Sequence, residues 1–425
     1  MTDAAAPRRV KRRCVLYVSG FDPKGAGHYH ALLRDEGGRQ AARDGWQLEV
    51  GARHRLPGGR VQWAVQGRGL DEAEAGLADE GVEVDYEFLR WDDLIRRHWP
   101  QGRLAVWAAI LRTQALYLRT GATARMHRLS WPITLATSLG LIWLLVLGLL
   151  IPALVAAVVL GLAPWTGGLL ATALGLAWGG LLLLAWQRLE ARYNMDWVSR
   201  CHAYTGLQAL GAVPGLDERI ADHAQTLIRH LHAAEHDEVL LVGHSLGSTL
   251  AVQILAEALR REPGLLAGGH PGRPAPCLSL LTLGQCLPLL GVLPAPLSDR
   301  LRADLAVLAA APGELDWVDF SAPPDACCFA LCDPYPVLGL ADVPAARRPK
   351  LLNPRFAEMF SPERYRAVRR DKFEMHFLYL RAADRPSDYD YFRIVAGRHT
   401  LAHRFASRPG QTTYRGLQGW GARRA

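Results

Sequence analysis

The chain has 425 residues, of which 50% are hydrophobic and 21% are charged. This length is sufficient for a large buried core. The formal net charge of +8 comes mostly from arginine, since lysine occurs only at positions 11, 24, 350 and 372. The basic residues are scattered and no recognition motif accompanies them, which excludes an obvious nucleic-acid-binding module; we expect them to solvate the surface and to favour an anionic membrane leaflet.

The first predicted strand, residues 14–18, follows a basic run without a secretory apolar segment, so we expect no cleavable signal peptide. A glycine-rich loop, residues 19–27, comes next. A glycine there lets a backbone amide approach a substrate, which favours an oxyanion-binding loop with the amide of Phe21 as a donor. A phosphate-binding loop is the alternative, although the lysine and hydroxyl spacing of a P-loop is missing.

Three further strands or strand-like segments are expected before the first long apolar stretch. Residues 46–51 and 61–66 alternate apolar and polar side chains around a Pro-Gly-Gly turn, which predicts a hairpin, and residues 82–89 predict another strand. Asp92 and Asp93 follow that strand. Carboxylates at the start of a helix usually cap it and interact favourably with its dipole, so we assign this pair no catalytic role.

An uncharged stretch occupies residues 129–187, where most side chains are Leu, Ala, Val, Gly or Trp. At about 20 residues per crossing, this stretch fits two membrane spans and a turn, but not three spans. We place the spans at residues 133–160 and 169–186 with the turn at residues 163–168. Pro152 is expected to kink the first helix.

Basic residues flank the uncharged stretch on both sides. Arg125 and Arg128 precede it and Arg188 and Arg192 follow it, whereas the turn between the spans carries no charge. The positive-inside rule then places both flanking segments in the cytoplasm. The amphipathic segment 104–118 is expected to lie at the bilayer surface. We therefore expect a multi-pass protein of the inner (cytoplasmic) membrane whose globular part faces the cytoplasm.

Strands and helices alternate after the apolar stretch. Residues 217–232 predict a helix, residues 238–242 a buried strand and residues 248–257 a second helix, and two more strands are expected at residues 278–283 and 315–320. This alternation predicts an α/β fold with a doubly wound, mostly parallel sheet.

Two clusters of metal-binding residue types are given structural interpretations: His230, His232 and His236, and Cys327, Cys328 and Cys332. The histidines lie on different faces of the predicted helix, so we expect solvated side chains. The cysteines fall in an apolar run that lacks zinc-ligand spacing, so we expect small buried hydrophobic residues. The seven cysteines of the chain fit a reducing cytoplasm, and we expect neither a metal nor another cofactor.

The run Gly-His-Ser-Leu-Gly that ends at Gly247 lies between the buried strand and the second helix. A sharp strand-to-helix turn lifts the Ser245 hydroxyl above the sheet, where a histidine can reach it and the amide of Leu246 can bind a developing oxyanion. Gly243 and Gly247 are required sterically, because side chains there would collide with the neighbouring backbone. A helix-capping turn is the alternative. We expect His244 to point away from the tip and to support the sheet or shape the pocket.

A serine nucleophile needs a base and an orienting carboxylate, which in such a fold follow it in the order Asp or Glu, then His. Asp325 follows a strand end and a Pro-Pro turn and is the favoured carboxylate, with Asp319 and Asp333 as alternatives. His376 lies in apolar surroundings suited to a neutral imidazole and is the favoured base. His399, which follows a predicted strand at residues 391–395, is the alternative base.

The elbow, the Ser–Asp–His order and the first strand with its Gly-Phe loop resemble the α/β-hydrolase superfamily, specifically its lipase and esterase branch. In many lipase-like chains the carboxylate ends a Trp-x-Asn-Phe-x-Asp-x-x-Asp stretch. Here the stretch from Trp317 to Asp325 matches at the last Asp and has Ala322 at the middle acidic position. The resemblance covers residues 15–21 and roughly residues 215–400, and the whole layout is similar to bacterial membrane-bound hydrolases. It implies an α/β-hydrolase fold with the apolar hairpin as an insertion.

We therefore expect residues 1–128 and 188–407 to form one hydrolase domain, interrupted by a hairpin at residues 129–187 and followed by a disordered basic tail at residues 408–425. The expected activity is hydrolysis of a carboxylic ester or thioester of a small or lipidic substrate through an acyl-enzyme on Ser245, next to the lipid bilayer. An acyltransferase that uses the same residues and a catalytically inactive membrane-bound binding module are the alternatives.

Overall fold

The computed structural model describes residues 9–70, 81–267 and 275–419. Within these residues nine strands form one mixed sheet in the order β2-β4-β5-β1-β6-β7-β8-β9, with β3 paired to β4. The strands are β1 (Arg12–Val18), β2 (Gln47–Val50), β3 (His54–Arg55), β4 (Val61–Arg68), β5 (Val82–Phe88), β6 (Glu238–His244), β7 (Cys277–Leu283), β8 (Asp316–Phe320) and β9 (Lys350–Leu352). Strands β1 and β5 to β9 pair in parallel and β2 to β4 pair antiparallel. The predicted α/β fold with a mostly parallel sheet is confirmed.

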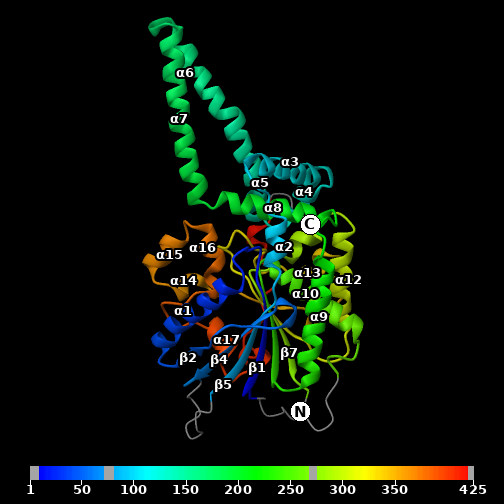
Figure 1. Ribbon diagram of the computed structural model, residues 1–425. Coiled ribbons are helices and arrows are strands. Elements are labelled where there is room, and N and C mark those ends of the chain that lie inside the picture. Colours follow the sequence, from blue (N-terminus) through cyan, green and yellow to red (C-terminus); the bar gives the residue numbers. More distant parts are fainter. Residues whose placement is uncertain (1–8, 71–80, 268–274, 420–425) are drawn as a thin grey trace.

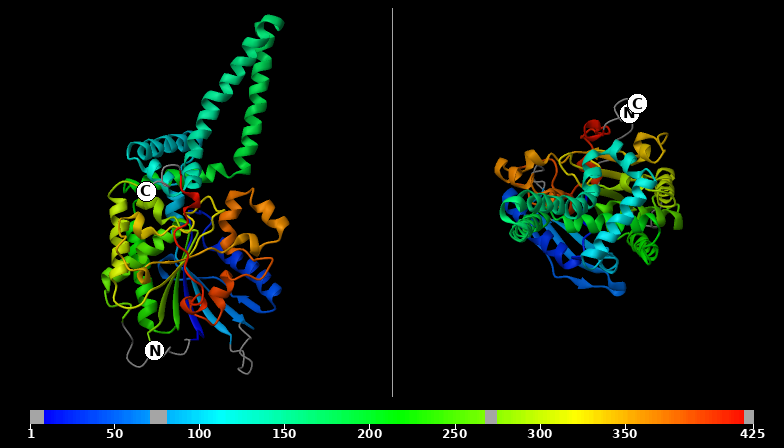
Figure 2. Two further views of the ribbon diagram at one scale, coloured as in Figure 1. Left: turned by 180° about the vertical axis from the view of Figure 1, so that it is seen from behind. Right: turned by 90° about the horizontal axis from the view of Figure 1, so that it is seen from above.

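The sheet side chains enter two cores, one on each face. In β1, Cys14 and Leu16 pack into one core and Val15 and Tyr17 into the other, as the two-residue period of a strand requires. The first face is covered by α9 (Leu216–Ala233), α10 (Leu246–Arg261) and α12 (Leu297–Ala310), and the second by α1 (Ala26–Asp44) and α17 (Tyr391–Ala396), as Figures 1 and 2 show. A strand covered on both faces is apolar throughout, which explains the fully buried β6.

The remaining helices are α2 (Asp92–Arg97), α3 (Arg103–Arg119), α4 (Ala122–Leu129), α5 (Trp131–Leu145), α6 (Ile151–Thr166), α7 (Gly168–Arg192), α8 (Met195–Ala209), α11 (Leu287–Gly291), α13 (Pro334–Val337), α14 (Phe356–Met359), α15 (Pro362–Val368), α16 (Lys372–Phe377) and α18 (Leu401–Arg404). Four 3₁₀ turns occur in the described residues, at Pro57–Gly59, Ala345–Arg347, Leu378–Leu380 and Arg415–Leu417.

Two long apolar helices project from one end of the globular domain (Figure 1). The first runs over Trp131–Thr166, 36 residues made of α5, a π-helical turn at Val146–Leu150 and α6; the second is α7, with 25 residues. Both are long and apolar enough to cross a membrane, judged by length and composition alone. The π-helical turn ends two residues before Pro152, whose missing N–H removes a helical hydrogen bond there. The expected turn at residues 163–168 is much shorter, because only Gly167, with φ 81°, separates the helices.

The lower part of the first apolar helix packs on the globular domain. Ile133 is buried, and a Cβ at Gly140 would lie 3.1 Å from Cδ1 of Ile110 on α3. The predicted span at residues 133–160 therefore includes about two helical turns that belong to the base of the hairpin.

Small residues let the two apolar helices approach each other. A Cβ at Gly175 would lie 2.5 Å from Cγ2 of Val159, and one at Gly179 would lie 2.8 Å from Cγ2 of Val155. Glycines four residues apart on one face are a common means of close packing between membrane helices.

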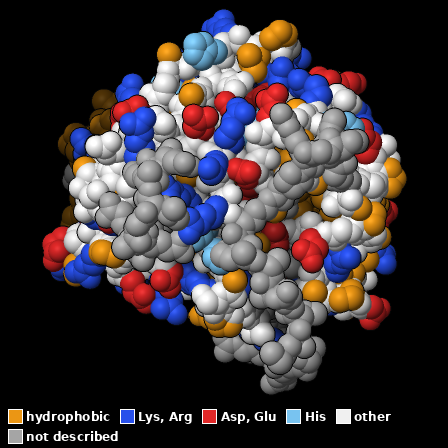
Figure 3. All heavy atoms as spheres, turned by 90° about the horizontal axis from the view of Figure 1, so that it is seen from below, with side chains coloured by type: hydrophobic (Ala, Val, Ile, Leu, Met, Phe, Trp, Pro, Cys, Tyr) orange, Lys and Arg blue, Asp and Glu red, His pale blue; other side chains and the backbone are white. Residues whose placement is uncertain are grey.

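A buried ion pair joins the two halves of the chain at the end of the sheet where the central strands β1 and β6 begin. Arg13 and Glu238 have no exposed side-chain surface, and Arg13 Nε lies 2.7 Å from Glu238 Oε2. Arg13 also donates to the carbonyl groups of Val395, Gly397 and His399. The surface at this end of the sheet is charged too. In the part not drawn in grey, acidic and basic side chains are intermixed (Figure 3).

Two sequence predictions for the C-terminal part are wrong. The predicted strand at residues 391–395 is the helix α17, because the Asp390 side chain accepts hydrogen bonds from the N–H groups of Phe392 and Arg393 and caps it. The predicted disordered tail is not free at residues 408–419: the N–H of Gln411 donates to Leu351 and that of Tyr414 to Leu331. Residues 420–425 lie outside the described residues.

Candidate active site

Ser245 is the single residue between β6 and α10, and it lies in a strained turn. Its backbone has φ 57° and ψ −127°, a conformation that costs an L-residue free energy and that is concentrated at functional sites. A Cβ at Gly243 would lie 2.6 Å from the carbonyl oxygen of Gly247, and a Cβ at Gly247 would lie 2.3 Å from that of Val18. The two glycines are thus required by close packing of the backbone, as the sequence suggested.

Asp325, in the loop that follows β8, forms a buried pair with His376 on α16. Each is 1% exposed, and His376 Nδ1 lies 2.7 Å from Asp325 Oδ2. The hydroxyl of Tyr379 donates to the same oxygen at 3.1 Å, and the N–H of Cys327 donates to Oδ1 at 2.9 Å. Burial alone raises the pKa of the Asp325 carboxyl, but the His376 ring and the N–H of Cys327 outweigh it and hold the pKa below its usual value.

Ser245 and His376 both lie against the C-terminal end of β7. The N–H of Ser245 donates to the carbonyl of Leu283 at 2.8 Å. The next residue, Gly284, has φ 55°, and a Cβ there would lie 3.2 Å from Cε1 of His376.

The remaining nitrogen of the His376 ring is available for proton transfer. His376 Nε2 is buried and has no hydrogen-bond partner among the described residues. The Ser245 hydroxyl is directed elsewhere, with its Oγ 4.0 Å from Cys286 Sγ. Within the described residues no hydrogen bond therefore joins Ser245 Oγ to His376 Nε2.

His244 contacts the backbone of the His376 segment. Its Nε2 lies 3.0 Å from the carbonyl oxygen of His376, and the two ring centroids are 4.9 Å apart. Burial lowers the pKa of His244 to about 3, so the ring is neutral and its Nε2–H donates to that carbonyl. His244 therefore supports the neighbouring imidazole, in keeping with the structural role expected for it.

The two amides expected to bind an oxyanion lie on either side of Ser245. Leu246 begins α10, and Phe21 follows Gly20, at which a Cβ would lie 2.8 Å from Ser245 Cβ. Across the described part of the chain, neither the Leu246 N–H nor the Phe21 N–H has a recorded hydrogen-bond acceptor. The carbonyl of Phe21 is held by Trp197 Nε1 at 2.9 Å.

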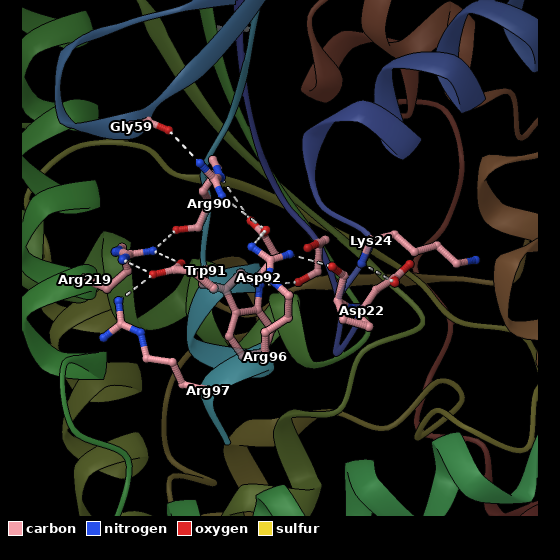
Figure 4. A network of polar contacts seen from close by, with 12 residues as sticks. Asp22, Lys24, Gly59, Arg90, Trp91, Asp92, Arg96, Arg97 and Arg219 are labelled. Atoms are coloured by element: carbon pink, nitrogen blue, oxygen red, sulfur yellow. Dashed lines mark hydrogen bonds and ion pairs between the residues drawn. The ribbon is translucent and has the colours of Figure 1, made fainter. Parts of the chain in front are cut away.

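A network of polar contacts fixes the loop that contains Phe21 (Figure 4). Trp91 Nε1 donates to the carbonyl of Ser19 at 2.8 Å, and Arg96 donates to that of Pro23 at 2.7 Å. Asp92, which is 1% exposed, pairs with Arg96 at 2.6 Å. The loop is therefore attached to α2 by the side chains of that short helix.

Asp92 and Asp93 lie in the first turn of α2, but neither caps it through its side chain, so the expected capping role is wrong. Asp93 instead accepts two hydrogen bonds from Arg219 on α9, at 2.7 and 2.9 Å, and lies 3.1 Å from Arg97. The two carboxylates that follow β5 are thus paired with arginine side chains and do not accept hydrogen bonds from the N–H groups at the start of α2.

The alternative triad members lie elsewhere. Asp319 accepts hydrogen bonds from Thr282 and Ser321 inside the sheet, and Asp333 caps α13. His399 lies at the edge where β6 begins, about 20 Å along that seven-residue strand from Ser245. Among the residues singled out in the sequence, Asp325 and His376 are the carboxylate and imidazole that the structure pairs; their catalytic roles stay predictions.

A small apolar cavity of about 60 Å³ reaches Ser245 from the base of the apolar hairpin. Its wall is formed by α5, α8 and the segments after β6, β7 and β8, including Ile133, Thr137, Trp197, Cys201, His202, Leu246, Cys286 and Cys327. Residues 195–209, which form α8, contain no motif from which a role at this site was predicted. The spacing of Trp197, Cys201 and Tyr204 on one helical face was the available signal.

One group of potential metal ligands coincides with this site. One ligand atom each of Asp325, Cys327 and His376 lie within 4.8 Å of one another. Burial raises the pKa of the Cys327 thiol well above its usual value, and Asp325 Oδ2 already accepts from His376, so an ion there requires that pair to separate.

The three histidines near the end of α9 were expected to be solvated, but one of them is buried. His236 follows the helix, is 5% exposed and lies 2.8 Å from Asp85, whereas His232 is exposed and lies 2.6 Å from Glu262. His230 lies 3.2 Å from Glu87. The reason is that Ala234, with φ 48°, ends the helix and turns the chain inward before His236.

Comparisons of the chain with protein-family models, with curated proteins and with solved structures found no match.

Proposed function

We propose that the protein is a membrane-anchored serine hydrolase of the α/β-hydrolase type, which cleaves a carboxylic ester or thioester. The observation that carries the proposal is the buried hydrogen bond between Asp325 and His376, at the strand ends from which the strained Ser245 projects. A buried carboxylate that holds an imidazole with a free nitrogen, beside a serine in such a turn, is the arrangement that activates a hydroxyl.

In the proposed reaction Ser245 Oγ attacks the substrate carbonyl while His376 Nε2 accepts its proton. Asp325 holds the ring by its Nδ1–H and stabilises the imidazolium that forms. The amides of Leu246 and Phe21 stabilise the oxyanion; losing one such donor usually costs about 3 kcal/mol. His376 then returns the proton to the leaving group, and water hydrolyses the acyl-enzyme by the same route.

The apolar hairpin supports membrane anchoring. Trp165 near its tip is 86% exposed and Leu169 is 92% exposed, and a large exposed apolar surface of this kind is unfavourable in water. On α3, at the base of the hairpin, Leu104, Leu111 and Leu118 are exposed at seven-residue spacing and so share one helix face. A helix with such a stripe suits the membrane surface.

The position of the cavity supports a lipidic or acylated substrate. Its wall includes Ile133 and Thr137, which begin the apolar helix that leads into the proposed bilayer. A substrate held in the membrane interface would thus be close to Ser245.

Labelling with a fluorophosphonate probe tests the proposed nucleophile in the detergent-solubilised full-length protein. We expect labelling of the wild type, no labelling of Ser245→Ala, and full labelling of the matched control Ser298→Ala on α12. Asp325→Asn should slow labelling by about 10³- to 10⁴-fold, because the imidazole loses the partner that fixes its tautomer. A folded wild-type protein that stays unlabelled would identify a non-catalytic binding module instead.

A further inference from the structure

One buried polar side chain in the Ser245 cavity has no partner. His202 on α8 is 4% exposed and lines the cavity together with Ser245. Neither of its ring nitrogens has a hydrogen-bond partner within the described ranges, and its nearest aromatic neighbour, Tyr117, meets it edge-on at 4.8 Å between centroids. Buried polar groups are normally paired, so the two nitrogens call for a partner outside the chain.

The other nitrogen- and oxygen-bearing side chains around the cavity are occupied, apart from the proposed nucleophile. Thr137 Oγ1 donates to the carbonyl of Ile133, and Thr205 Oγ1 donates to that of His202. Trp197 Nε1 donates to Phe21. The rest of the wall is aliphatic or carries thiols. His202 is therefore the group that offers strong hydrogen bonding to a ligand otherwise surrounded by apolar atoms.

The ring is neutral in this position. Burial lowers the pKa of His202 to about 4, so at neutral pH one ring nitrogen carries a proton and the other is an acceptor. A neutral imidazole, with one donor and one acceptor nitrogen, is complementary to an uncharged hydroxyl group, which can both donate and accept a hydrogen bond. An ionised ligand group would be poorly solvated in so apolar a cavity.

Resting on the proposed function, we propose that His202 is a specificity-determining residue that binds a hydroxyl group on the acyl arm of the substrate. The cavity of about 60 Å³ accommodates only a few non-hydrogen atoms, so the hydroxyl lies close to the scissile carbonyl. The preferred substrate class is an ester or thioester of a hydroxylated acyl group.

The test compares two esters on the full-length protein in detergent: 4-nitrophenyl butyrate and 4-nitrophenyl 3-hydroxybutyrate. We expect the wild type to have at least a tenfold higher kcat/KM for the hydroxylated ester, because a site built around a hydrogen bond discriminates against a substrate that lacks it. His202→Phe keeps a ring and removes both nitrogens. It should lower the ratio of kcat/KM for the hydroxylated ester to kcat/KM for the plain ester about tenfold or more.

His202→Gln, which keeps one donor and one acceptor, should retain part of the preference and serves if His202→Phe does not fold. A wild-type ratio near one, or an unchanged ratio in a folded His202→Phe protein, overturns the assignment and indicates a bound water at His202. Fluorophosphonate labelling of Ser245 separates the two proposals: a labelled protein without preference for the hydroxylated ester fails only the His202 assignment. An unlabelled wild type fails the proposed hydrolase itself and with it the assignment.

Discussion

Gly247 lies in the most closely packed part of the turn that contains Ser245. A Cβ there would lie 2.3 Å from the carbonyl oxygen of Val18 and 2.5 Å from that of Ser19. Both neighbours are backbone atoms of the strand end that precedes the Phe21 loop, so neither can rotate away. We expect Gly247→Ala to destabilise the protein by about 1–3 kcal/mol or more and to abolish fluorophosphonate labelling, because the turn must shift.

Gly38 supplies the matched control for that substitution. It lies on the exposed side of α1, and no heavy atom lies within 4 Å of a Cβ placed there. Gly38→Ala should stabilise the protein by up to about 1 kcal/mol, because alanine favours a helix interior. Thermal unfolding in detergent measures both; equal effects would contradict the steric explanation for Gly247.

Asp319 predicts a pH dependence of stability. It is buried beside Thr282 and Ser321, and burial raises the pKa of its carboxyl to about 7, although these two hydrogen bonds act in the opposite direction. The unfolded state loses this proton near pH 4, whereas the folded state keeps it until about pH 7. The folded protein is therefore penalised progressively as the pH rises from 4 to 7, by at most about 4 kcal/mol.

Asp319→Asn removes this titration and keeps an uncharged side chain of similar shape. We expect the difference in unfolding midpoint, variant minus wild type, to increase between pH 4 and pH 7 and to level off above pH 7. A difference independent of pH would show that Asp319 is ionised in the folded protein throughout this range.

The sequence predicted part of the candidate site and missed the rest for identifiable reasons. Ser245 and its two glycines were predicted from a local motif, and Asp325 and His376 from chain order. The contact of Tyr379 with Asp325, and the presence of His202 and Ser245 in the wall of one cavity, depend on segments far apart in the chain, which no local pattern encodes.

Apolar runs in the sequence predicted the strands well and the short helices poorly. β1, β6, β7 and β8 match their predicted segments because strands buried on both faces are mostly apolar. β5 matches because its apolar residues alternate with polar ones, of which Glu83 is exposed. Residues 391–395 are equally apolar but form α17, since the Asp390 cap determines the conformation. A short apolar run by itself does not distinguish a buried strand from a buried helix.

The packing between α6 and α7 leads to a prediction about the hairpin. A Cβ at Gly175 would lie 2.5 Å from Val159 Cγ2 and 3.3 Å from the carbonyl oxygen of Val155. Gly175→Leu should separate the helices and lower the unfolding temperature in detergent, since close approach is the main source of attraction between apolar helices in lipid.

Gly180, on the same helix, is the control because nothing lies within 4 Å of a Cβ placed there. Gly180→Leu should change the unfolding temperature little. If both variants behave alike, the small residues of α7 do not determine how the hairpin packs.

The apolar hairpin separates β1 from β6 in the sequence, but the two strands are neighbours in one continuous sheet. β1, which precedes the hairpin, pairs along its length with β6, which follows it, and the buried Arg13–Glu238 pair fastens the same two strands. Both flanking parts of the chain must therefore lie on one side of any membrane that the hairpin enters. Arg125, Arg128 and Arg188 close to the base favour the cytoplasmic side for both.

This topology predicts which positions a protease can reach in membrane vesicles. Epitope tags at the two chain ends should be digested in inverted vesicles and protected in right-side-out vesicles. A tag inserted at Gly167, the residue between α6 and α7, should show the opposite pattern, because the turn carries no charge to retain it in the cytoplasm. Release of the full-length protein by an alkaline carbonate wash, or tags at the two ends on opposite sides, would contradict a hairpin that enters and leaves the bilayer beside one continuous sheet.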